Sequence, residues 1–192
     1  MESTIEAWEL PESLPIAGRE YGIRTDFRDV LRILAAFSDP GLKEDEKVYV
    51  CLFILFVDFE ALPPAAYEEA FKAASQFIDC GRDWQEAPKK SPRVMDWEQD
   101  KSILFPAINK VAGLEVRTVP YMHWWTFMGY YMEISEGIFS TILSLRQKRA
   151  KGKKLEKWER EFWQQNKDIC VLKKRLSQEE IEERERLNAL LG

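Results

Sequence analysis

The sequence predicts an all-α protein of about seven to eight helices, with a compact helical body, long C-terminal helices and a small N-terminal β-hairpin. Apolar residues recur at three- and four-residue spacings through most of the chain, as on the buried face of a helix. Proline, glycine and short polar clusters separate these segments. The expected helices cover residues 26–37, 43–60, 65–79, 96–112, 120–134, 137–151, 154–175 and 178–190.

The hairpin is expected over residues 13–23, where SLPIAGREYGI alternates apolar and other residues on both arms of a short turn. Ala17 and Gly18 can make that turn. An isolated two-stranded hairpin is marginal in water, so it must pack on the helices. The alternating apolar residues are Leu14, Ile16, Tyr21 and Ile23.

The first three expected helices come after the hairpin along the chain. Thr25 is the expected N-cap of the first, and the stretch 38–41 (SDPG) ends it. The second contains VYVCLFILFV, which is apolar on every side and therefore predicts a buried central helix. Its β-branched residues leave a strand as the alternative. Two prolines separate it from the third helix, which Cys80 and Gly81 end.

The fourth helix is expected to begin with acidic residues at Asp96, to be kinked at Pro106 and to stop at Gly113. Pro120 is expected to start a helix unusually rich in aromatic residues, and a sixth helix follows it over residues 137–151. Because the aromatic residues occupy two faces, their helix is either central to the core or exposed to a partner. They are Tyr121, Trp124, Trp125, Phe127, Tyr130 and Tyr131.

The expected helix 154–175 carries apolar residues in a heptad-like seam, which closes within one chain or pairs two copies in a homo-oligomer. A capping box over residues 177–180 (SQEE) starts the last helix. The seam consists of Leu155, Trp158, Phe162, Ile169, Leu172 and Leu176. Trp163 lies off the seam, so one seam cannot bury every aromatic residue here. The candidate protein-interaction residues are Trp158, Phe162, Trp163, Ile169 and Leu172.

Charge divides the chain into a helical body over residues 1–145 and a C-terminal extension over residues 146–192, which can pack on the body. The body has 14 basic and 24 acidic side chains, residues 146–176 have 12 and 4, and residues 177–192 have 2 and 5. No base-reading motif accompanies the basic stretch, so docking on acidic protein surface is favoured over nucleic acid. The basic patch comprises Arg146, Lys148, Arg149, Lys151, Lys153 and Lys154.

The sequence predicts neither an enzyme nor a metal or cofactor site. His123 is the only histidine and stands beside two tryptophans on an expected buried helix, which indicates a structural role. Acids two residues apart near Asp96 are spread around a helix rather than gathered for a metal. The three cysteines are far apart in sequence and the longest apolar run is ten residues, so we expect a reduced protein without membrane spans.

Residues from about 12 to 175 resemble the bacteriophage gene-product-fifteen family of long-tailed phages and prophages. The resemblance is carried by MDWEQD and YMHWWTFM, and more weakly by IRTDFR, LKEDEK, FIDCG and KLEKWEREFW. The acidic helix after Ser177 departs from the family pattern. The resemblance implies no catalytic residues and gives the motif residues roles in the fold or in an interface. These residues are Asp96, Trp97, Asp100, His123, Trp124 and Trp125.

The resemblance also implies a function in tail morphogenesis, because members are encoded beside the tape measure gene. The expected function is a tail assembly chaperone in the host bacterial cytoplasm that binds the tape measure protein, the tail tube protein or both. Apolar grooves suit such amphipathic helical partners. The alternative is a structural minor tail or head–tail component that stays in the virion. A nucleic-acid-binding protein acting through the basic patch ranks third, and would lose affinity steeply with salt.

Overall fold

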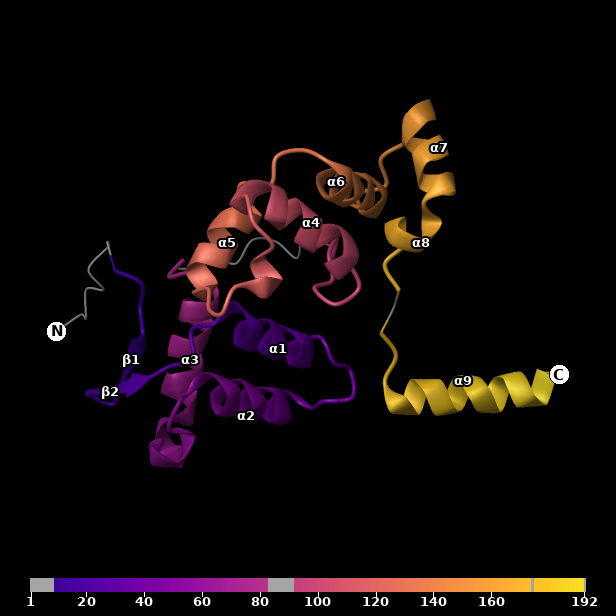
Figure 1. Cartoon of the computed structure of the whole chain (residues 1–192). Coiled ribbons are helices and arrows are strands. Elements are labelled where there is room, and N and C mark those ends of the chain that lie inside the picture. Colours follow the sequence, from indigo (N-terminus) through magenta and orange to yellow (C-terminus); the bar gives the residue numbers. More distant parts are fainter. Residues whose placement is uncertain (1–8, 83–91, 174, 192) are drawn as a thin grey trace.

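The computed structural model describes residues 9–82, 92–173 and 175–191, and these residues form nine α-helices and one two-stranded hairpin (Figure 1). The all-α class with an N-terminal hairpin is therefore confirmed. The strands are β1 (Ser13–Ile16) and β2 (Arg19–Gly22). The helices are α1 (Phe27–Phe37), α2 (Glu44–Leu55), α3 (Tyr67–Ile78), α4 (Lys101–Ala112), α5 (Trp124–Met132), α6 (Ile138–Ala150), α7 (Lys157–Gln165), α8 (Lys167–Cys170) and α9 (Gln178–Leu191).

The hairpin forms as predicted and packs on α3. Its strands are antiparallel, with Leu14 paired to Tyr21. Ala17 and Gly18 both have positive φ angles, 50° and 76°, as a tight type I′ turn requires. Leu14, Ile16 and Tyr21 are buried, so the alternating pattern directs one face of the hairpin into the core.

The helices of the body form two layers. Helices α1 and α2 lie side by side, α3 crosses their ends, and α4 and α5 cover α1 (Figure 1). Helix α6 packs on α4 and carries the chain to α7 and α8. The main core extends from the hairpin to Phe139 at the start of α6. A smaller core lies beyond it and joins α6 to the C-terminal helices through Ile142, Leu145, Trp163 and Cys170.

Helix α2 corrects the prediction of a buried central helix over residues 43–60. It ends at Leu55, because the next residues pair with the segment after the hairpin, and the guanidinium of Arg24 donates to the carbonyl oxygens of Phe53, Ile54, Phe56 and Val57. Only one face of α2 is buried. The opposite face exposes Phe53 and Tyr49 to solvent.

Three helices start at other residues than predicted. Helix α1 is capped by Asp26 rather than Thr25, since the Asp26 side chain accepts from the backbone N–H of Arg28. Helix α4 begins at Lys101 rather than residue 96, after a turn held by Asp96. Helix α5 begins at Trp124, because the residues before it are extended alongside residues 25–27.

The expected single helix over residues 154–175 is wrong, and so is its heptad-like seam. Helix α7 ends at Gln165, and both the backbone and the side-chain N–H groups of its C-cap Asn166 donate to the carbonyl oxygen of Phe162. Helix α8 is a single turn, and the chain is extended from Val171. The predicted boundary between body and extension falls inside α6, and the division into two parts stays a prediction.

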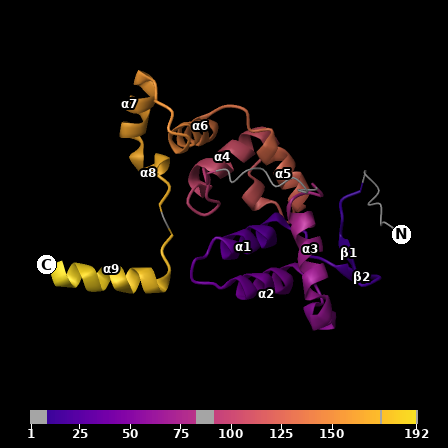
Figure 2. The same cartoon turned by 180° about the vertical axis from the view of Figure 1, so that it is seen from behind.

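Helix α9 projects from the rest of the molecule (Figures 1 and 2). Its predicted capping box is confirmed: the N–H of Ser177 donates to the Glu180 carboxylate, and the N–H of Glu180 donates to the Ser177 hydroxyl. Every side chain that the structure describes in α9 is exposed. Across the described part of the chain, none of the helices has the length and apolar content needed to span a membrane.

Candidate functional site

The two strongest sequence motifs, MDWEQD and YMHWWTFM, join distant segments of the chain. The first motif, MDWEQD, is bonded to Arg146, whose five N–H donors all have acceptors. The guanidinium donates twice to the Asp100 carboxylate, at 2.7 and 2.8 Å. It also donates to the carbonyl oxygens of Cys170 (2.8 Å), Val94 (3.0 Å) and Ile169 (2.6 Å). A buried, fully bonded Arg–Asp pair of this kind fixes the geometry between α4, α6 and α8.

Asp96 extends this network to the segment before α9. One carboxylate oxygen accepts the backbone N–H groups of Glu98 and Gln99, which makes the turn before α4. The same carboxylate accepts two hydrogen bonds from Arg175, at 2.8 and 3.0 Å. Gln99 adds two bonds to the backbone of residues 171 and 173. The DWEQD motif therefore anchors the C-terminal segment on the body.

His123 caps α5. Its Nδ1 accepts the backbone N–H of Trp125 at 3.0 Å, and its Nε2 lies 3.1 Å from the carbonyl oxygen of Pro11. A neutral ring with the proton on Nε2 satisfies both bonds. Burial lowers the pKa of His123 below its ordinary value of 6.5, although the bond to Pro11 and the nearby Glu12 oppose this shift. The histidine therefore acts as a neutral structural cap.

The two tryptophans of the HWW motif close the end of α3. The indole N–H of Trp124 donates to the carbonyl oxygen of Ile78, and that of Trp125 donates to Phe77, both at 2.8 Å. These carbonyls belong to the last turn of α3, where intrahelical partners run out. Gly81 lies directly under Trp125, since a Cβ there would come within 3.2 Å of the ring. The HWW and FIDCG motifs are thus two halves of one contact.

Trp97 completes the aromatic cluster around these motifs. Its ring lies 5.3 Å from that of Tyr131 and 6.1 Å from that of Trp124, measured between centroids. It is half-buried. Of the six motif residues, Asp96, Asp100, His123 and Trp124 are buried, and all six make contacts within the chain. Through these contacts the six residues stabilise the fold.

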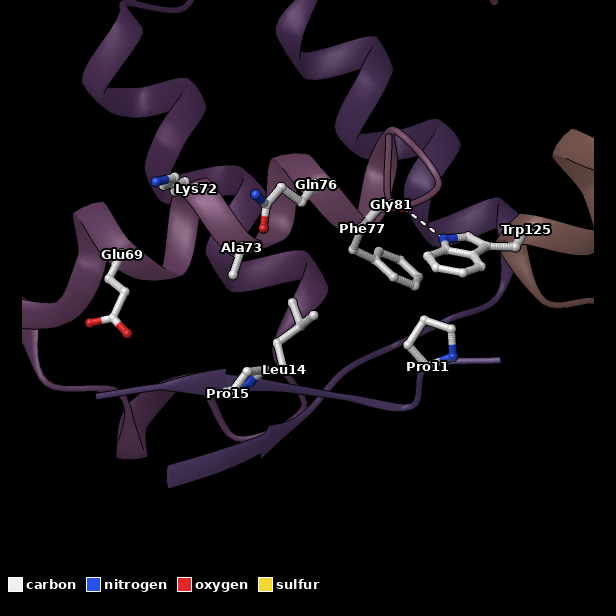
Figure 3. A pocket seen from close by; sticks show the side chains of 10 residues that line it. All are labelled: Pro11, Leu14, Pro15, Glu69, Lys72, Ala73, Gln76, Phe77, Gly81 and Trp125. Carbon is white, nitrogen blue, oxygen red and sulfur yellow. Dashed lines mark hydrogen bonds between the residues drawn. The ribbon is translucent and has the colours of Figure 1, made fainter. Parts of the chain in front are cut away.

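A groove of about 490 Å³ separates β1 from α3 beside the HWW motif (Figure 3). Pro11, Leu14 and Pro15 line the hairpin side, and Trp125 closes one end. At the other end the Glu69 carboxylate accepts the backbone N–H of Ala17. The walls are mostly apolar, and this carboxylate is already engaged in holding the hairpin turn. The groove suits a packed side chain rather than acid–base chemistry.

The thiols are poor nucleophiles. Burial raises the pKa of Cys51 to about 12 and, despite nearby Arg82, that of Cys80 to about 11. Burial also raises the pKa of Cys170. A thiol with so high a pKa holds almost no thiolate at neutral pH. Among the residues that the structure places, no cluster of three or more His, Cys, Asp or Glu side chains could bind a metal ion.

The predicted basic patch is divided between the interior and the surface. Arg146 is buried and does not belong to a surface patch, which corrects the prediction. Its position four residues after Ile142 puts it on the buried face of α6, and this spacing was the available signal. Lys148 pairs with buried Glu159 and thereby lowers the pKa of that carboxyl. Lys151 is exposed, and Arg149, Lys153 and Lys154 line one groove.

The predicted interaction residues are similarly scattered. Trp163 is buried in the smaller core, so it offers no exposed anchor. Phe162 and Ile169 are half-buried against that core, and Leu172 is half-buried in the extended segment. Trp158 alone of these five is largely exposed, at 57%. Its interaction role, like that of the others, stays a prediction.

Sequence reasoning missed a group of aromatic side chains at the surface. Exposed Tyr49 and Phe53 and half-buried Phe59 contact one another, with ring centroids 5.2 to 6.2 Å apart. Val57 is exposed beside them, and we call these four residues the aromatic patch. The signal was present in VYVCLFILFV: residues 49 and 53 lie four apart and share one helix face. The patch borders a groove of about 400 Å³ that the acidic side chains Asp29, Asp58 and Glu60 also line.

Comparison with known protein families shows what the chain is similar to. A family model described as Bacteriophage Gp15 protein matches residues 8–172 of the chain. No curated protein and no solved structure matches it. The matched region contains the Arg146–Asp100 pair, the α3–α5 contact and the aromatic patch, and it ends before Arg175 and α9.

Proposed function

Because the chain belongs to the Bacteriophage Gp15 protein family, we propose that it is a tail assembly chaperone that binds the tape measure protein, the tail tube protein or both. The family makes it a phage protein. The finer assignment draws on the family resemblance, which implies tail morphogenesis, and on the surface of the molecule. A chaperone function requires a surface that binds another protein.

The observation that carries the proposal is the aromatic patch on α2. Phe53 is 57% exposed and Tyr49 is 51% exposed, although each is a large ring on a helix with a well-buried opposite face. Aromatic side chains dominate the energetics of protein–protein contacts because they supply large area with few rotatable bonds. A cluster of such rings on a monomer surface marks an interaction site.

The patch is held rigid before any partner arrives. Arg24 binds four carbonyl oxygens at the end of α2, which fixes the turn between Phe53 and Phe59. On its inner side Phe59 contacts the Tyr67 ring, with centroids 5.6 Å apart. A preorganised surface loses less conformational entropy on binding than a mobile one. The patch therefore suits tight but reversible binding.

An amphipathic helix is the partner that this surface fits best. Such a helix presents apolar residues at spacings of three and four, which can fill the groove beside the rings. Carboxylates of Asp29, Asp58 and Glu60 lie at the groove and favour basic residues on the flanks of the partner. A tape measure protein is a long helix that must stay soluble until tube subunits polymerise around it.

Co-expression with the tape measure protein tests the proposal. We expect the two proteins to co-purify, and Phe53→Glu to weaken binding at least about tenfold. Ile138→Glu is the matched control, because Ile138 is similarly exposed but lies at the start of α6. Trp158→Ala tests the residue that the sequence indicated. Circular dichroism of each variant checks that the fold is retained.

Two outcomes would contradict the proposal. One is a tape measure protein and a tail tube protein that are equally soluble without this chain and never co-purify with it. The other is detection of the chain by mass spectrometry in purified virions at the copy number of a structural component, since a chaperone leaves the particle. The second result would instead support the minor tail or head–tail alternative.

A further inference from the structure

Every side chain that the structure describes in α9 is exposed, and two of them are leucines. It has 14 residues, and a helix of this length is marginal in water without packing partners. Leu187 and Leu190 are exposed, the latter at 77%. Together with Glu180 and Glu183 they fall on one face, at spacings of three and four residues. Residues 177–192 have five acidic and two basic side chains, so this helix is acidic, with Leu187 and Leu190 exposed near its C-terminal end.

A groove with the opposite charge lies between the end of α6 and α7. Its volume is about 430 Å³, and we call it the basic groove. Four cationic side chains and no carboxylate line it, and its apolar lining residues are Leu155 and Trp163. The Arg149 guanidinium lies 4.3 Å from the Trp163 ring centroid. The lining residues are Arg149, Gly152, Lys153, Lys154, Leu155, Arg160, Trp163 and Gln164.

The groove and α9 are complementary in two respects. Carboxylates on α9 match the ammonium and guanidinium groups at the groove, where none of the four cations has an ion-pair partner among the residues that the structure covers. The exposed leucines match the apolar lining. Burying leucine side chains stabilises a contact more than surface charge alone does. Both features together specify one orientation.

The chain cannot easily dock α9 into its own groove. Two hydrogen bonds from Arg175 to Asp96 and two between Gln99 and residues 171 and 173 hold the segment before α9 on the start of α4. Only two residues separate Arg175 from Gln178, the first residue of α9. Both views show α7 and α9 at opposite ends of the C-terminal segment, with α8 between them (Figures 1 and 2). A second copy has no such restraint.

We propose that α9 of one copy docks in the basic groove of a second copy, so that the protein associates with itself. The contact joins two different surfaces, and reciprocal exchange of α9 between two copies closes a dimer. This inference concerns a surface apart from the aromatic patch. Its test needs no tail protein, so the result does not depend on whether the proposed function is correct.

Charge reversal provides the test. Light scattering of the wild-type full chain should give a mass above that of a monomer, which falls as salt is raised. Lys153→Glu/Lys154→Glu reverses the charge of the groove, and Glu183→Lys reverses the charge on the docking face of α9 without changing its capping box. In each variant alone, the groove of one copy and α9 of the other carry like charges. We expect the dissociation constant for self-association to rise at least about tenfold.

Mixing the two variants is the decisive experiment. An acidic α9 then meets a wild-type basic groove, and a basic α9 meets an acidic groove, so both contacts regain opposite charges. We expect association to return in the mixture. Leu187→Ala/Leu190→Ala should weaken association as well, with circular dichroism checking the body of each variant.

The proposal is overturned if the wild-type chain is monomeric at all concentrations and salt conditions. It is also overturned if the reversed variants self-associate normally, or if their mixture does not recover. A basic groove could instead bind nucleic acid, which predicts a monomer whose retention on DNA is lost in Lys153→Glu/Lys154→Glu. That result too would contradict docking of α9.

Discussion

His123 shows how a single side chain can couple the fold to pH. Both ring nitrogens are used, one to cap α5 and one toward the Pro11 carbonyl, and burial lowers the pKa of the ring. When the pH falls below the ordinary value of 6.5, the unfolded chain binds a proton that the folded chain resists. The free energy of unfolding therefore falls as the pH decreases through and below this value.

Replacement of the ring tests this coupling. His123→Asn keeps a good N-cap but cannot titrate, and it should lower the free energy of unfolding by about 1 kcal/mol near neutral pH. The gap between wild type and variant should narrow as the pH is lowered from about 8 to about 5.5, because only the wild type loses stability at this position. Urea titrations at each pH measure the gap. A gap that is constant or widens would contradict the assigned protonation state.

At the scale of elements, the contact between α5 and the end of α3 can be separated into backbone and packing contributions. Gly81 and Gly113 have nearly the same φ, +72° and +71°. A Cβ at Gly81 would meet Trp125, whereas at Gly113 it would meet nothing within 4 Å. Alanine should therefore cost about 1–2 kcal/mol at Gly113 from backbone strain alone, and about 1–3 kcal/mol more at Gly81.

A double-mutant cycle tests whether Trp125 causes the additional cost of alanine at Gly81. In a Trp125→Ala background the additional cost of Gly81→Ala should disappear, while the cost of Gly113→Ala should not change. Thermal or urea unfolding of the variants provides the free energies. Equal costs at the two glycines would mean that Trp125 moves aside freely, and the contact would then have little importance for the fold.

Elements that depend on neighbouring residues could be predicted from the sequence, and those that depend on distant ones could not. The Ala17–Gly18 turn and the capping box at Ser177 involve only local bonds, so both were found. The start of α5 depends on backbone pairing with residues near Asp26, almost a hundred positions away. Helical periodicity alone does not reveal such a partner.

The candidate site was also only partly predictable from the sequence. Asp96, Asp100 and the HWW residues could be singled out by their motifs, but their partners Arg146, Ile78 and Phe77 come from other elements. The aromatic patch was missed for a different reason. A helix that is apolar on every side is usually buried, and only the packed structure shows that one face of α2 is uncovered.

Over the whole molecule, one ion pair joins the two cores. Arg146 on α6 links Asp100 at the start of α4 to the backbone around Cys170, between the main core and the smaller one. Removing one member of a buried pair leaves an uncompensated charge, so Asp100→Ala should lower the free energy of unfolding by about 3–5 kcal/mol. The helices after α6 should separate first from the body.

A neighbouring acid supplies the control for this prediction. Glu98 forms an exposed pair with Lys101, and Glu98→Ala should change the free energy of unfolding by less than about 1 kcal/mol. Urea unfolding compares the two variants, and hydrogen exchange shows whether α7 and α8 lose protection before α1 and α3. Similar effects of the two substitutions would contradict the role given to the buried pair.

The anchoring of the C-terminal segment at Asp96 has a consequence for how this protein can diversify. The last bonds that tie this segment to the start of α4 are those of Arg175, and the family match ends at residue 172. Substitution, exchange or loss of the residues after Arg175 leaves these bonds and both cores in place. The C-terminal helix can therefore be exchanged or removed without redesign of the body.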